Sequence, residues 1–333
     1  MESKLNDYII IKKIASGNYS TVYKAQHIPT KTMVALKQIS KKKIKTKNEF
    51  KFLQREVYLL KSLDHPFIAT FFEVVDDLEN FYISMELIEN QTLLDYVENS
   101  QGISEPEART LFLQIISIIY YLHKIMRVMH RDIKDDNFLI DVNNNIKIID
   151  FGLSRVFDKK DPFLSTPEII KEKPYTSAAD IWSLGVILYT MVACCLPFNG
   201  DNVNMQLHEI LYAEPLIPES WSCNLRDLMR RLLNKDPGAR ITLEEIMNHP
   251  WITEFNDKNC INEDLNFLLS IKVVDLENLD QDVLLEMMNL GFDVDDIQHE
   301  LEEKTINRKT ATYKILRSTK LKKKLFQLPI SIF

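Results

Sequence analysis

The residues of this chain best suited to chemistry are two acids and an amide in one short stretch. Asp132, Asn137 and Asp150 stand in the sequence HRDIKDDNFLIDVNNNIKIIDFG, residues 130–152. An amide oxygen and a carboxylate held side by side suit a hard cation such as Mg²⁺. A second carboxylate nearby can orient a hydroxyl group and accept its proton. The stretch therefore predicts a magnesium site with a spare acid.

A hairpin is the element that must bring these side chains together. Two β-prone runs, residues 138–142 and 146–149, flank the turn-forming asparagines 143–145. Folding about the middle of this turn places Asn137 beside Asp150, at roughly the 5 Å spacing of cross-strand neighbours. The alternative is a surface hairpin with solvated acids, and the aliphatic residues on both strand faces argue against it.

The N-terminal region predicts either a site for a phosphate chain or a plain hairpin. Residues 8–14 alternate as a strand does, residues 15–20 form a turn of small and polar residues, and residues 21–25 resume the alternation. A turn of this kind can direct backbone N–H groups at phosphates. It contains a single glycine, Gly17, so a hairpin without a ligand explains the pattern equally well.

Lys37 is a charged residue in an apolar strand. Residues 33–37 predict that strand, and Lys37 is either exposed on it or kept for an anion. Residues 50–63 predict a helix with an apolar face, and this helix carries Glu56, a candidate partner for Lys37. A further β-prone run at residues 81–87 completes the β-rich region.

From Thr92 onward the sequence predicts helices. Ser104 with Glu107, and Thr242 with Glu245, have the spacing of capping boxes. Residues 175–193 and 223–233 have the apolar patterns of helices. The predicted fold class is therefore α+β, with a small β-rich region followed by a larger helical one.

The composition is that of an ordinary globular protein. The 333 residues are 45% hydrophobic and 27% charged, with a net charge of −7. Nucleic acid phosphates require a basic surface, so this acidic balance argues against nucleic acid as a partner. Lys41, Lys42, Lys43, Lys45 and Lys47 form one basic cluster, and its simplest interpretation is a solvated loop.

The four cysteines predict a reducing compartment, so we expect the protein in the cytoplasm or the nucleus. Cys194 and Cys195 are adjacent, and Cys223 and Cys260 are isolated, so neither a disulfide framework nor a zinc-ligand spacing is present. The first residues contain no apolar signal region. Residues 181–198 are the most apolar stretch but are short for a bilayer, which takes about 20 residues. They predict a buried helix and no transmembrane segment.

In their order and spacing, the motifs of this chain resemble those of the eukaryotic protein kinase family over residues 8–252. The resemblance implies a bilobal fold with a β-rich N-lobe at residues 8–87 and a helical C-lobe at residues 88–252. The motifs are Val34-Ala35-Leu36-Lys37, His130-Arg131-Asp132 with Asn137, Asp150-Phe151-Gly152, Pro167-Glu168, the helix start Asp180-Ile181-Trp182-Ser183-Leu184-Gly185, and Arg240, which in this family pairs with the glutamate.

The resemblance implies that the chain binds ATP. Lys37 would hold the α- and β-phosphates and be held by Glu56, and Met85 would stand beside the adenine in a hinge that continues through Glu86 and Leu87. The residues implied to line the nucleotide are Ile14, Ala15, Ser16, Gly17, Asn18, Tyr19, Ser20, Thr21, Val22, Ala35, Lys37, Glu56, Met85, Glu86 and Leu87.

The same resemblance assigns roles around the central stretch. Asn137 and Asp150 would hold Mg²⁺, and Asp132 would accept the proton of the substrate hydroxyl. Lys134 would neutralise charge on the transferred phosphoryl group. The implied reaction is transfer of the ATP γ-phosphoryl group to serine or threonine hydroxyls of protein substrates. Reactions of this kind serve signalling.

The phosphate loop departs from the family pattern. Ala15, Gly17 and Ser20 occupy the positions where the family has three glycines, so only the middle one is kept. Ala and Ser are small, and Gly17 is the position where the backbone comes closest to the phosphates. We therefore expect weakened or slower ATP handling, not its loss.

The activation segment departs further. Residues 153–165 form a shorter segment than is usual in the family, and the usual acceptor threonine is absent. Arg131 is present to bind a phosphate. The remaining hydroxyls are those of Ser154, Ser165 and Thr166.

After a linker at residues 253–275, the chain has a second resemblance. Residues 279–317 predict three short helices, with Leu290-Gly291-Phe292 between the first two. Residues 276–318 are similar to the ubiquitin-associated-like module that follows the kinase domain in the AMP-activated, sucrose-non-fermenting and microtubule-affinity-regulating kinases, within the calcium/calmodulin-kinase-like group. The resemblance implies an intramolecular contact with the kinase domain or a regulatory subunit as partner. A generic three-helix appendage is the alternative.

The last residues, 319–333, form a basic and apolar tail. Lys322, Lys323 and Lys324 precede an apolar end. The pattern fits a membrane-surface or docking tail, and a frayed terminus is the simpler interpretation.

Two functions remain open on the sequence. The charged groups that phosphoryl transfer needs are all present, which favours an active serine/threonine kinase. The alternative is a pseudokinase-like scaffold that binds nucleotide without efficient transfer, suggested by the short activation segment and the depleted phosphate loop. Burying unpaired charged residues costs free energy, so a chain that did not use its catalytic residues would not be expected to keep them. This argues against the scaffold.

Overall fold

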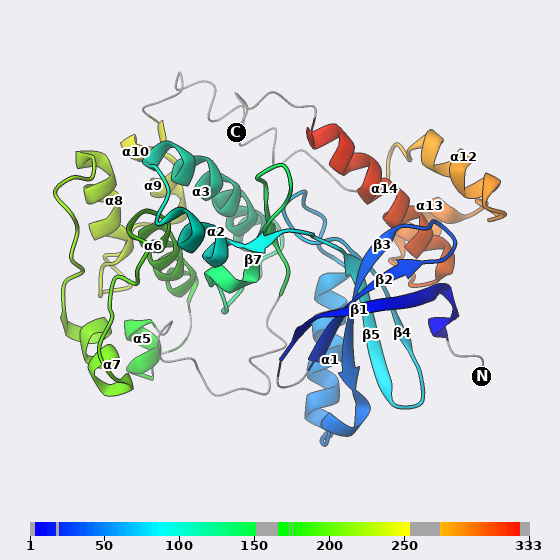
Figure 1. Ribbon diagram of the computed structural model, residues 1–333, viewed down its shortest axis with the longest axis horizontal. Coiled ribbons are helices and arrows are strands. Elements are labelled where there is room, and N and C mark those ends of the chain that lie inside the picture. The colour runs from blue at the N-terminus through cyan, green and yellow to red at the C-terminus, as the bar shows by residue number, and fades with distance from the viewer. Residues whose placement is uncertain are drawn as a thin grey trace. The chain divides into compact units, whose positions relative to one another are not determined.

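The computed structural model describes residues 4–17, 20–150, 166–172, 174, 176–253 and 274–326. Its contacts divide the chain into two compact units (Figure 1). Unit 1 contains residues 1–89 together with 271–330, and unit 2 contains residues 90–270 with the last three residues. The three C-terminal helices therefore group with the β-rich region.

Unit 1 is built on an antiparallel five-stranded sheet of order β1-β2-β3-β5-β4. Its elements up to residue 89 are the 3₁₀ turn Lys4–Asp7, β1 (Tyr8–Ser16), β2 (Ser20–His27), β3 (Met33–Ser40), the 3₁₀ turn Lys41–Lys43, α1 (Lys47–Leu60), β4 (Phe71–Asp76) and β5 (Asn80–Glu86). The expected strands near residues 8, 33 and 81 are confirmed. β4 was not expected, and β1 extends through Ser16, two residues into the predicted turn.

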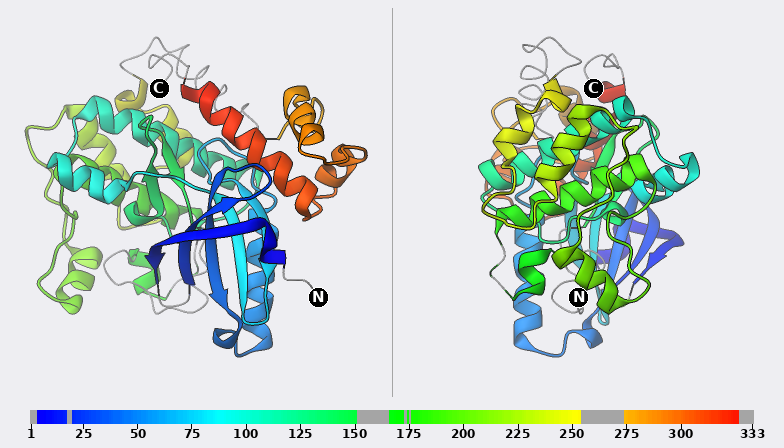
Figure 2. Two further views of the ribbon diagram at one scale, coloured as in Figure 1. Left: turned by 45° about the vertical axis from the view of Figure 1, so that its right-hand side comes forward. Right: turned by 90° about the vertical axis from the view of Figure 1, so that its left-hand side faces the viewer.

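Helix α1 begins at Lys47, three residues before the predicted start at Phe50. Thr46 accepts a hydrogen bond from the backbone N–H of Glu49, and the Glu49 carboxylate accepts in return from the N–H of Thr46. This capping box fixes the first turn. Figure 2 shows α1 lying along one face of the sheet.

The C-terminal helices are α12 (Gln281–Asn289), α13 (Ile297–Glu302) and α14 (Arg308–Phe326). Three helices were expected, and three are present among the described residues from 274 to 326. They share a core of Val283, Met287, Ile297, Leu301, Tyr313 and Leu316. Gly291 has a φ of 84° in the turn after α12, a left-handed conformation that favours glycine.

Helix α14 is longer than predicted and packs on the sheet. It continues to Phe326, past the expected module boundary at residue 318, through residues that favour helix. Ile315 is fully buried in a cluster with residues of the sheet, including Leu36, Phe72 and Tyr82. The C-terminal helices therefore share a core with the sheet, in addition to their own.

Lys314 lies on the same helix in an unfavourable position for a charge. Its ammonium is 5.8 Å from the centre of the Phe71 ring. Burial lowers the pKa of Lys314 to about 8, with Lys61 and Lys304 acting in the same direction and Asp64 opposing them.

Replacing Lys314 with methionine is expected to stabilise the protein most below pH 8. The unfolded chain keeps this proton up to its ordinary pKa of 10.5, whereas the folded chain releases it from about 8. Native stability therefore rises between these two pH values and is lowest below them. Melting temperatures measured across this range should rise for the wild type and stay flatter for Lys314→Met. Parallel curves would contradict the assignment.

Unit 2 is mainly helical and contains a small sheet of order β6-β7-β8. Its elements are β6 (Gln91–Thr92), α2 (Leu93–Ser100), α3 (Glu105–Tyr120), a π-helical turn (Tyr121–Ile125), a 3₁₀ turn (Asp135–Asn137), β7 (Phe138–Ile140), β8 (Ile146–Ile148), α5 (Pro167–Ile170), α6 (Ser177–Ala193), α7 (Val203–Tyr212), α8 (Cys223–Leu232), α9 (Leu243–Met247) and α10 (Pro250–Thr253).

The predicted caps of unit 2 are partly confirmed. Thr242 and Glu245 form the expected capping box at α9. Ser104 caps α3 by accepting from the N–H of Glu107. The reciprocal bond expected from Glu107 is wrong, because its carboxylate accepts instead from the hydroxyl of Tyr96.

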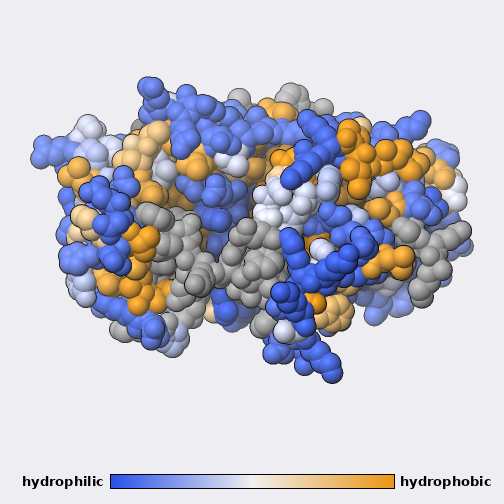
Figure 3. All heavy atoms as spheres, turned by 60° about the horizontal axis from the view of Figure 1, so that its bottom comes forward, coloured by the Kyte–Doolittle hydropathy of each residue, from blue (hydrophilic) through white to orange (hydrophobic). Residues whose placement is uncertain are grey.

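Helix α6 is the predicted buried helix. Every residue from Ala179 to Met191 is buried. Across the described ranges, no helix is both long and apolar enough to cross a membrane. On the face drawn in Figure 3, hydrophobic residues reach the surface in patches between hydrophilic ones.

Candidate active site

Asp132 and Asn137 lie together in unit 2. The Asn137 side-chain amide donates to the backbone oxygen of Asp132 at 2.8 Å and to its carboxylate at 3.1 Å. Both bonds use the Asn137 side-chain nitrogen and not Oδ1, which is the atom that would bind a cation. The donor set fits Mg²⁺, which prefers amide and carboxylate oxygens.

The loop that carries Asp132 is held by a buried acid. Asp180, fully buried in the first turn of α6, accepts from the backbone N–H groups of His130 at 3.0 Å and Arg131 at 3.1 Å. It also lies 2.7 Å from Nε2 of His123. Arg131 has a φ of 68°, an unusual conformation for a residue other than glycine. Asp180 therefore fixes the backbone immediately before Asp132.

His130 is a structural residue of the same loop. Burial lowers its pKa, against the opposing effect of the nearby carboxylates of Asp180, Asp132 and Asp150. The ring is thus neutral, and its Nδ1 accepts from the N–H of Asp132 at 3.3 Å. The acids whose charge acts on the pKa of His130 include Asp132 and Asp150, the two that are expected to take part in chemistry.

The register of the hairpin differs by one residue from the expected one. Phe138 stands opposite Ile148, and the N–H of Ile149 donates to the backbone oxygen of Asn137 at 3.0 Å. Ile149, not Asp150, is therefore the cross-strand neighbour of Asn137. The expectation that Asn137 and Asp150 face each other directly is wrong.

The side chain of Asp141 explains this shift. It accepts from the N–H groups of Asn143 at 2.8 Å and Asn145 at 2.9 Å. The N–H of Asp141 donates to the backbone oxygen of Asn145 at 2.9 Å, so residues 142–144 form the loop. Asn144 takes the left-handed conformation that the asparagine run predicted, with a φ of 60°.

Lys134 and its acidic neighbours lie between Asp132 and the hairpin. Lys134 precedes the 3₁₀ turn Asp135–Asn137 and is partly buried. Burial, reinforced by Asp136, raises the pKa of Asp135. Lys134 is therefore placed in the same short loop as Asp132, as its expected role requires.

The candidate nucleotide residues of unit 1 lie on neighbouring strands. Ala35 stands opposite Met85, and Lys37 stands opposite Ile83. Lys37 is 8% exposed and Glu56, on α1, is 9% exposed. Lysine and glutamate side chains are rarely this buried, so the burial of Lys37 and Glu56 indicates a structural or functional role for each.

The candidate phosphate loop is the turn between β1 and β2. Ala15 pairs with Val22, and Ser16 pairs with Thr21. The N–H of Gly17 donates to the backbone oxygen of Ser20 at 2.9 Å, which closes the turn. Ile14 is 44% exposed on β1. The predicted site residues Asn18 and Tyr19 lie outside the described residues.

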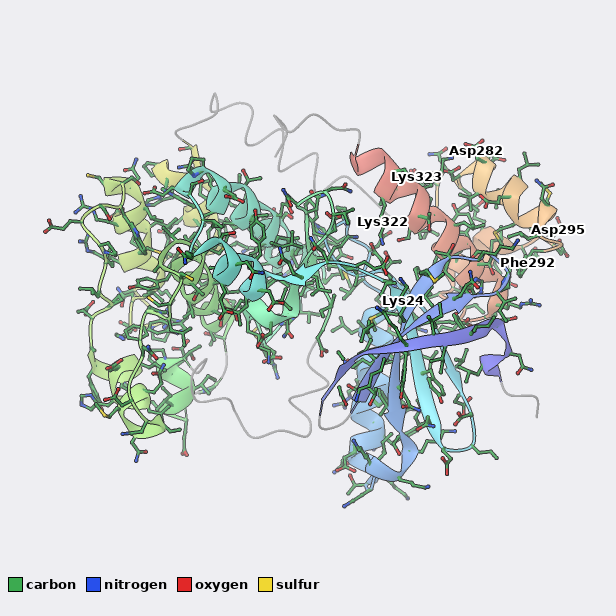
Figure 4. The ribbon with its side chains drawn as sticks, viewed as in Figure 1. Lys24, Asp282, Phe292, Asp295, Lys322 and Lys323 are labelled. Atoms are coloured by element: carbon green, nitrogen blue, oxygen red, sulfur yellow. The ribbon has the colours of Figure 1, made fainter. Side chains whose placement is uncertain are left out.

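The candidate hinge is held by a lysine that sequence reasoning missed. Lys322 of α14 donates to the backbone oxygen of Leu87 at 3.0 Å and lies 3.1 Å from the Glu86 carboxylate (Figure 4). The other carboxylate oxygen of Glu86 accepts from the N–H and the hydroxyl of Thr70. Nearby, Lys24 of β2 pairs with Glu89.

Replacing Lys322 with alanine is expected to destabilise unit 1 by about 1 kcal/mol, because it removes a charged donor from Leu87 and Glu86. The Glu86 side chain is only 1% exposed and loses a counterion. Urea unfolding should reveal the loss. The adjacent Lys323, which is exposed, gives the control, and an equal effect of Lys323→Ala would rule out a specific contact.

The end of the activation segment is anchored by a buried ion pair. Arg240 donates to both carboxylate oxygens of Glu168, at 2.8 and 3.0 Å, which confirms the expected pair. Thr166 is 4% exposed and caps α5, so in this structure its hydroxyl is engaged as a cap. Phe151, Gly152, Ser154 and Ser165 lie outside the described residues.

The predicted site residues thus fall into two groups. Lys37, Glu56, the phosphate loop and the hinge belong to unit 1, and the catalytic loop with Asp150 belongs to unit 2. The sequence analysis named Asp180 only as part of a motif and missed its role as the anchor of the loop. The feature that could have indicated this role is an acid at the start of an apolar helix. Lys322 had no such signal, because it belongs to a run of three lysines.

The comparison with protein families identifies the family of this chain. The protein kinase domain matches residues 8–252. The chain belongs to the protein kinase family. The expected family and the α+β bilobal kinase fold are therefore confirmed. The domain boundaries proposed for the linker, the module and the tail stay predictions.

The curated relatives indicate to which branch of the protein kinase family the chain is similar. The SNF1-related protein kinase catalytic subunit alpha KIN12 of Arabidopsis thaliana is 35% identical over 94% of this chain and 64% of its own length. The serine/threonine-protein kinase SIK2 of Gallus gallus is 34% identical over 93% of this chain and 40% of its own length. A protein of Dictyostelium discoideum named "Probable serine/threonine-protein kinase MARK-A" is 38% identical over 76% of this chain and 24% of its own length.

These relatives confirm the resemblance to the SNF1-related and MARK branch. The chain spans less than two thirds of the length of each of the three relatives. The matches with KIN12 and SIK2 include most of the region beyond residue 252, since they cover more than nine tenths of this chain.

Proposed function

We propose that this protein kinase is an active enzyme that transfers the γ-phosphoryl group of ATP to serine or threonine hydroxyls of protein substrates. The observation that carries the proposal is the pair of bonds from Asn137 to Asp132 in a loop held by Asp180. These bonds hold the Asn137 amide against the Asp132 carboxylate, which supports a base and a metal ligand in one loop.

The residues of unit 2 supply the chemistry at the hydroxyl. Asp132 orients the hydroxyl and accepts its proton. Lys134, in the same loop, offsets negative charge on the transferred group. Asn137 and Asp150 would hold Mg²⁺, which neutralises phosphate charge when bound. Such catalysis depends on positioning, and the bonds from Asp180 fix the loop before the substrate arrives.

The residues of unit 1 bind the nucleotide in this proposal. Lys37 is buried on β3 in the position that contacts the α- and β-phosphates in this family, and Glu56 is buried on α1. Ala35 and Met85, opposite each other, would enclose the adenine. The single Gly17 supports slower ATP handling.

The C-terminal helices support a regulatory role for residues 276–318. They share a core with the sheet through Ile315, and Lys322 reaches the hinge. An intramolecular contact is therefore the form of regulation that we propose. For the compartment we propose the cytoplasm or the nucleus, supported by the free thiols of Cys194, Cys195 and Cys223.

Removing residues 276–333 is expected to change the catalytic rate and lower the melting temperature. The deletion exposes the sheet residues that Ile315 covers and releases the hinge from Lys322. Initial rates and melting curves of the two proteins give the comparison. An unchanged rate would reduce these helices to a docking module.

A transfer assay tests the proposed function. The purified chain is incubated with Mg²⁺, labelled ATP and a generic protein substrate, beside Asp132→Ala. We expect phosphoserine and phosphothreonine from the wild type alone. Equally low incorporation by both proteins, with ATP binding retained, would instead establish the scaffold, which no feature of the described residues favours.

A further inference from the structure

A groove lies in the C-terminal helices of unit 1, between the segment that leads into α12 and the start of α13. Its cavity volume is about 560 Å³. The lining comes from residues between 277 and 284 and between 294 and 298, and its apolar side chains are those of Leu279, Leu284, Val294 and Ile297. We call it the α12–α13 groove.

The floor of the α12–α13 groove is the outer side of a core. Ile297 is 3% exposed and belongs to the core that the three C-terminal helices share. Leu279, Leu284 and Val294 are half-buried and pack against the same core. An apolar side chain placed in the groove would therefore extend an existing core and lose its own contact with water, which is favourable.

The rim of the groove is acidic. Glu277 and Asp296 line it, and both are exposed. Asp296 precedes α13, but its side chain makes no cap bond to that helix. Neither carboxylate forms an ion pair with another of the described residues, and none of the described residues that line the groove is basic. Both carboxylates are therefore available to a cation.

The glutamines of the groove also favour a ligand that donates hydrogen bonds. The side-chain nitrogen of Gln298 donates to the backbone oxygen of Leu276 at 3.1 Å and to the Glu302 carboxylate at 3.2 Å. That of Gln281 donates to the backbone oxygen of Leu279 at 3.3 Å. An amide nitrogen has two hydrogens, so Gln298 has used both, and its oxygen can only accept.

The charge around the groove has the same sign as its rim. Residues 274–303 contain eleven aspartates and glutamates and no lysine or arginine. Three of these acids pair with Lys309 and Lys320 of α14. Figure 4 shows another, Asp295, at the outer edge of the C-terminal helices. The summed charge of this segment attracts positively charged partners.

We propose that the α12–α13 groove binds a basic segment of another protein. An apolar side chain of the segment lies on the floor formed by Leu284, Val294 and Ile297. Lysines or arginines that flank it pair with Glu277 and Asp296. This binding site is additional to the packing of α14 on the sheet, and it does not rest on the proposed catalytic function.

The shape and charge of the groove favour a peptide segment over other cationic or flat partners. A volume of about 560 Å³ lies within the range for ligand pockets, about 300–1,000 Å³, and leaves room for more than one side chain. A small polyamine would satisfy the acids but leave the apolar floor in water. The negative surface of an anionic membrane would be repelled by the acids.

The test uses an array of short labelled peptides in which lysines or arginines flank one Leu, Ile, Phe or Trp. Matched peptides carry Ala in place of the apolar residue, or Glu in place of the basic ones. Binding to the full chain is measured by fluorescence anisotropy without nucleotide. Members of the basic set are expected to bind about tenfold more tightly than both matched sets, and less tightly as salt rises.

Two double variants place the binding at the groove. Glu277→Gln with Asp296→Asn removes both charges of the rim and is expected to weaken binding about tenfold. Asparagine tolerates the left-handed conformation of Asp296, whose φ is 61°. Glu286→Gln with Glu303→Gln removes the same charge at exposed positions that do not line the groove, and it should change binding less than twofold.

Three results would overturn the proposal. No member of the array binds, or the control pair weakens binding as much as the groove pair, or the chain alone forms a dimer in analytical ultracentrifugation that the groove pair dissociates. The last result would assign the groove to a second copy of this chain. Because the assay contains no ATP, Asp132→Ala should bind the peptides as the wild type does, so the outcome is independent of catalysis.

Discussion

Replacing Asp132 with asparagine is expected to lower kcat about 10²- to 10⁴-fold, the usual contribution of a general base. Asparagine keeps the shape of the side chain and can still accept from Asn137, which bonds the Asp132 carboxylate at 3.1 Å. It cannot take up the proton of the substrate hydroxyl. The loop should remain folded because its anchor, Asp180, bonds the backbone of His130 and Arg131.

Steady-state kinetics with nucleotide binding measured in parallel make this test specific. Asp132 is not one of the two expected Mg²⁺ ligands, so ATP affinity should stay near that of the wild type. Asp201→Asn, on the exposed surface of unit 2, is the control for loss of an acid. A kcat for Asp132→Asn equal to that of Asp201→Asn would remove Asp132 from the mechanism.

Replacing Arg240 with methionine is expected to destabilise unit 2 by about 3–5 kcal/mol, because it leaves one charge of a buried pair without its partner. The Arg240 and Glu168 side chains are 0% and 3% exposed. Arg240 also donates to the backbone oxygens of Asn234 at 2.9 Å and Ala178 at 2.5 Å, so these acceptors lose a donor as well.

The double variant, with Glu168→Leu added, should recover part of this loss because no unpaired charge remains. The guanidinium carbon of Arg240 lies 5.1 Å from the centre of the Trp182 ring, so tryptophan fluorescence during urea unfolding can follow the site. Arg231→Met breaks a pair with Asp227 whose side chains are 57% and 48% exposed, and it should cost no more than about 1 kcal/mol. Equal losses for Arg240→Met and Arg231→Met would show that burial of the pair has no energetic consequence.

Much of the fold follows from local sequence patterns. The strands at β1, β3 and β5 were predicted from alternation, and the buried helix α6 from its continuous apolar run. The capping box at Thr242 was predicted because both bonds lie within one helical turn. At Ser104 the same spacing gave only one of the two bonds of a capping box, since the hydroxyl of Tyr96, eleven residues earlier on α2, donates to the carboxylate of Glu107.

The hairpin shows where local reasoning fails within the candidate site. The asparagine run correctly predicted a turn with a left-handed residue, Asn144. It did not predict that the side chain of Asp141 would organise the loop and shift the register by one residue. Turn propensity gives the place of a turn, whereas the register depends on which side chain bonds the loop backbone.

Contacts between distant segments could not be predicted from the sequence. Lys322 is one of three adjacent lysines, and no local pattern distinguishes the one that reaches Leu87. The same holds for Ile315, whose burial depends on a sheet far away in the sequence. The extension of α14 to Phe326 brings both residues onto one helix, so the expected frayed tail begins with an ordered helical segment.

The effects of the depleted phosphate loop and the short activation segment on the catalytic rate stay predictions. Their residues are partly outside the described ranges, including Asn18, Tyr19 and residues 151–165. The described parts of the site give no reason for a loss of activity. Lys37 and Glu56 are buried, and the Glu168–Arg240 pair is formed.

Single-turnover transfer is the most direct measurement of the central claim. The wild-type chain, in excess over labelled ATP, is mixed with Mg²⁺ and a generic protein substrate, and the label is followed from ATP to protein over time. The account predicts that the label moves to serine and threonine of the substrate, and that Asp132→Asn slows this movement about 10²- to 10⁴-fold. ATP that stays bound and intact with the wild type would contradict it.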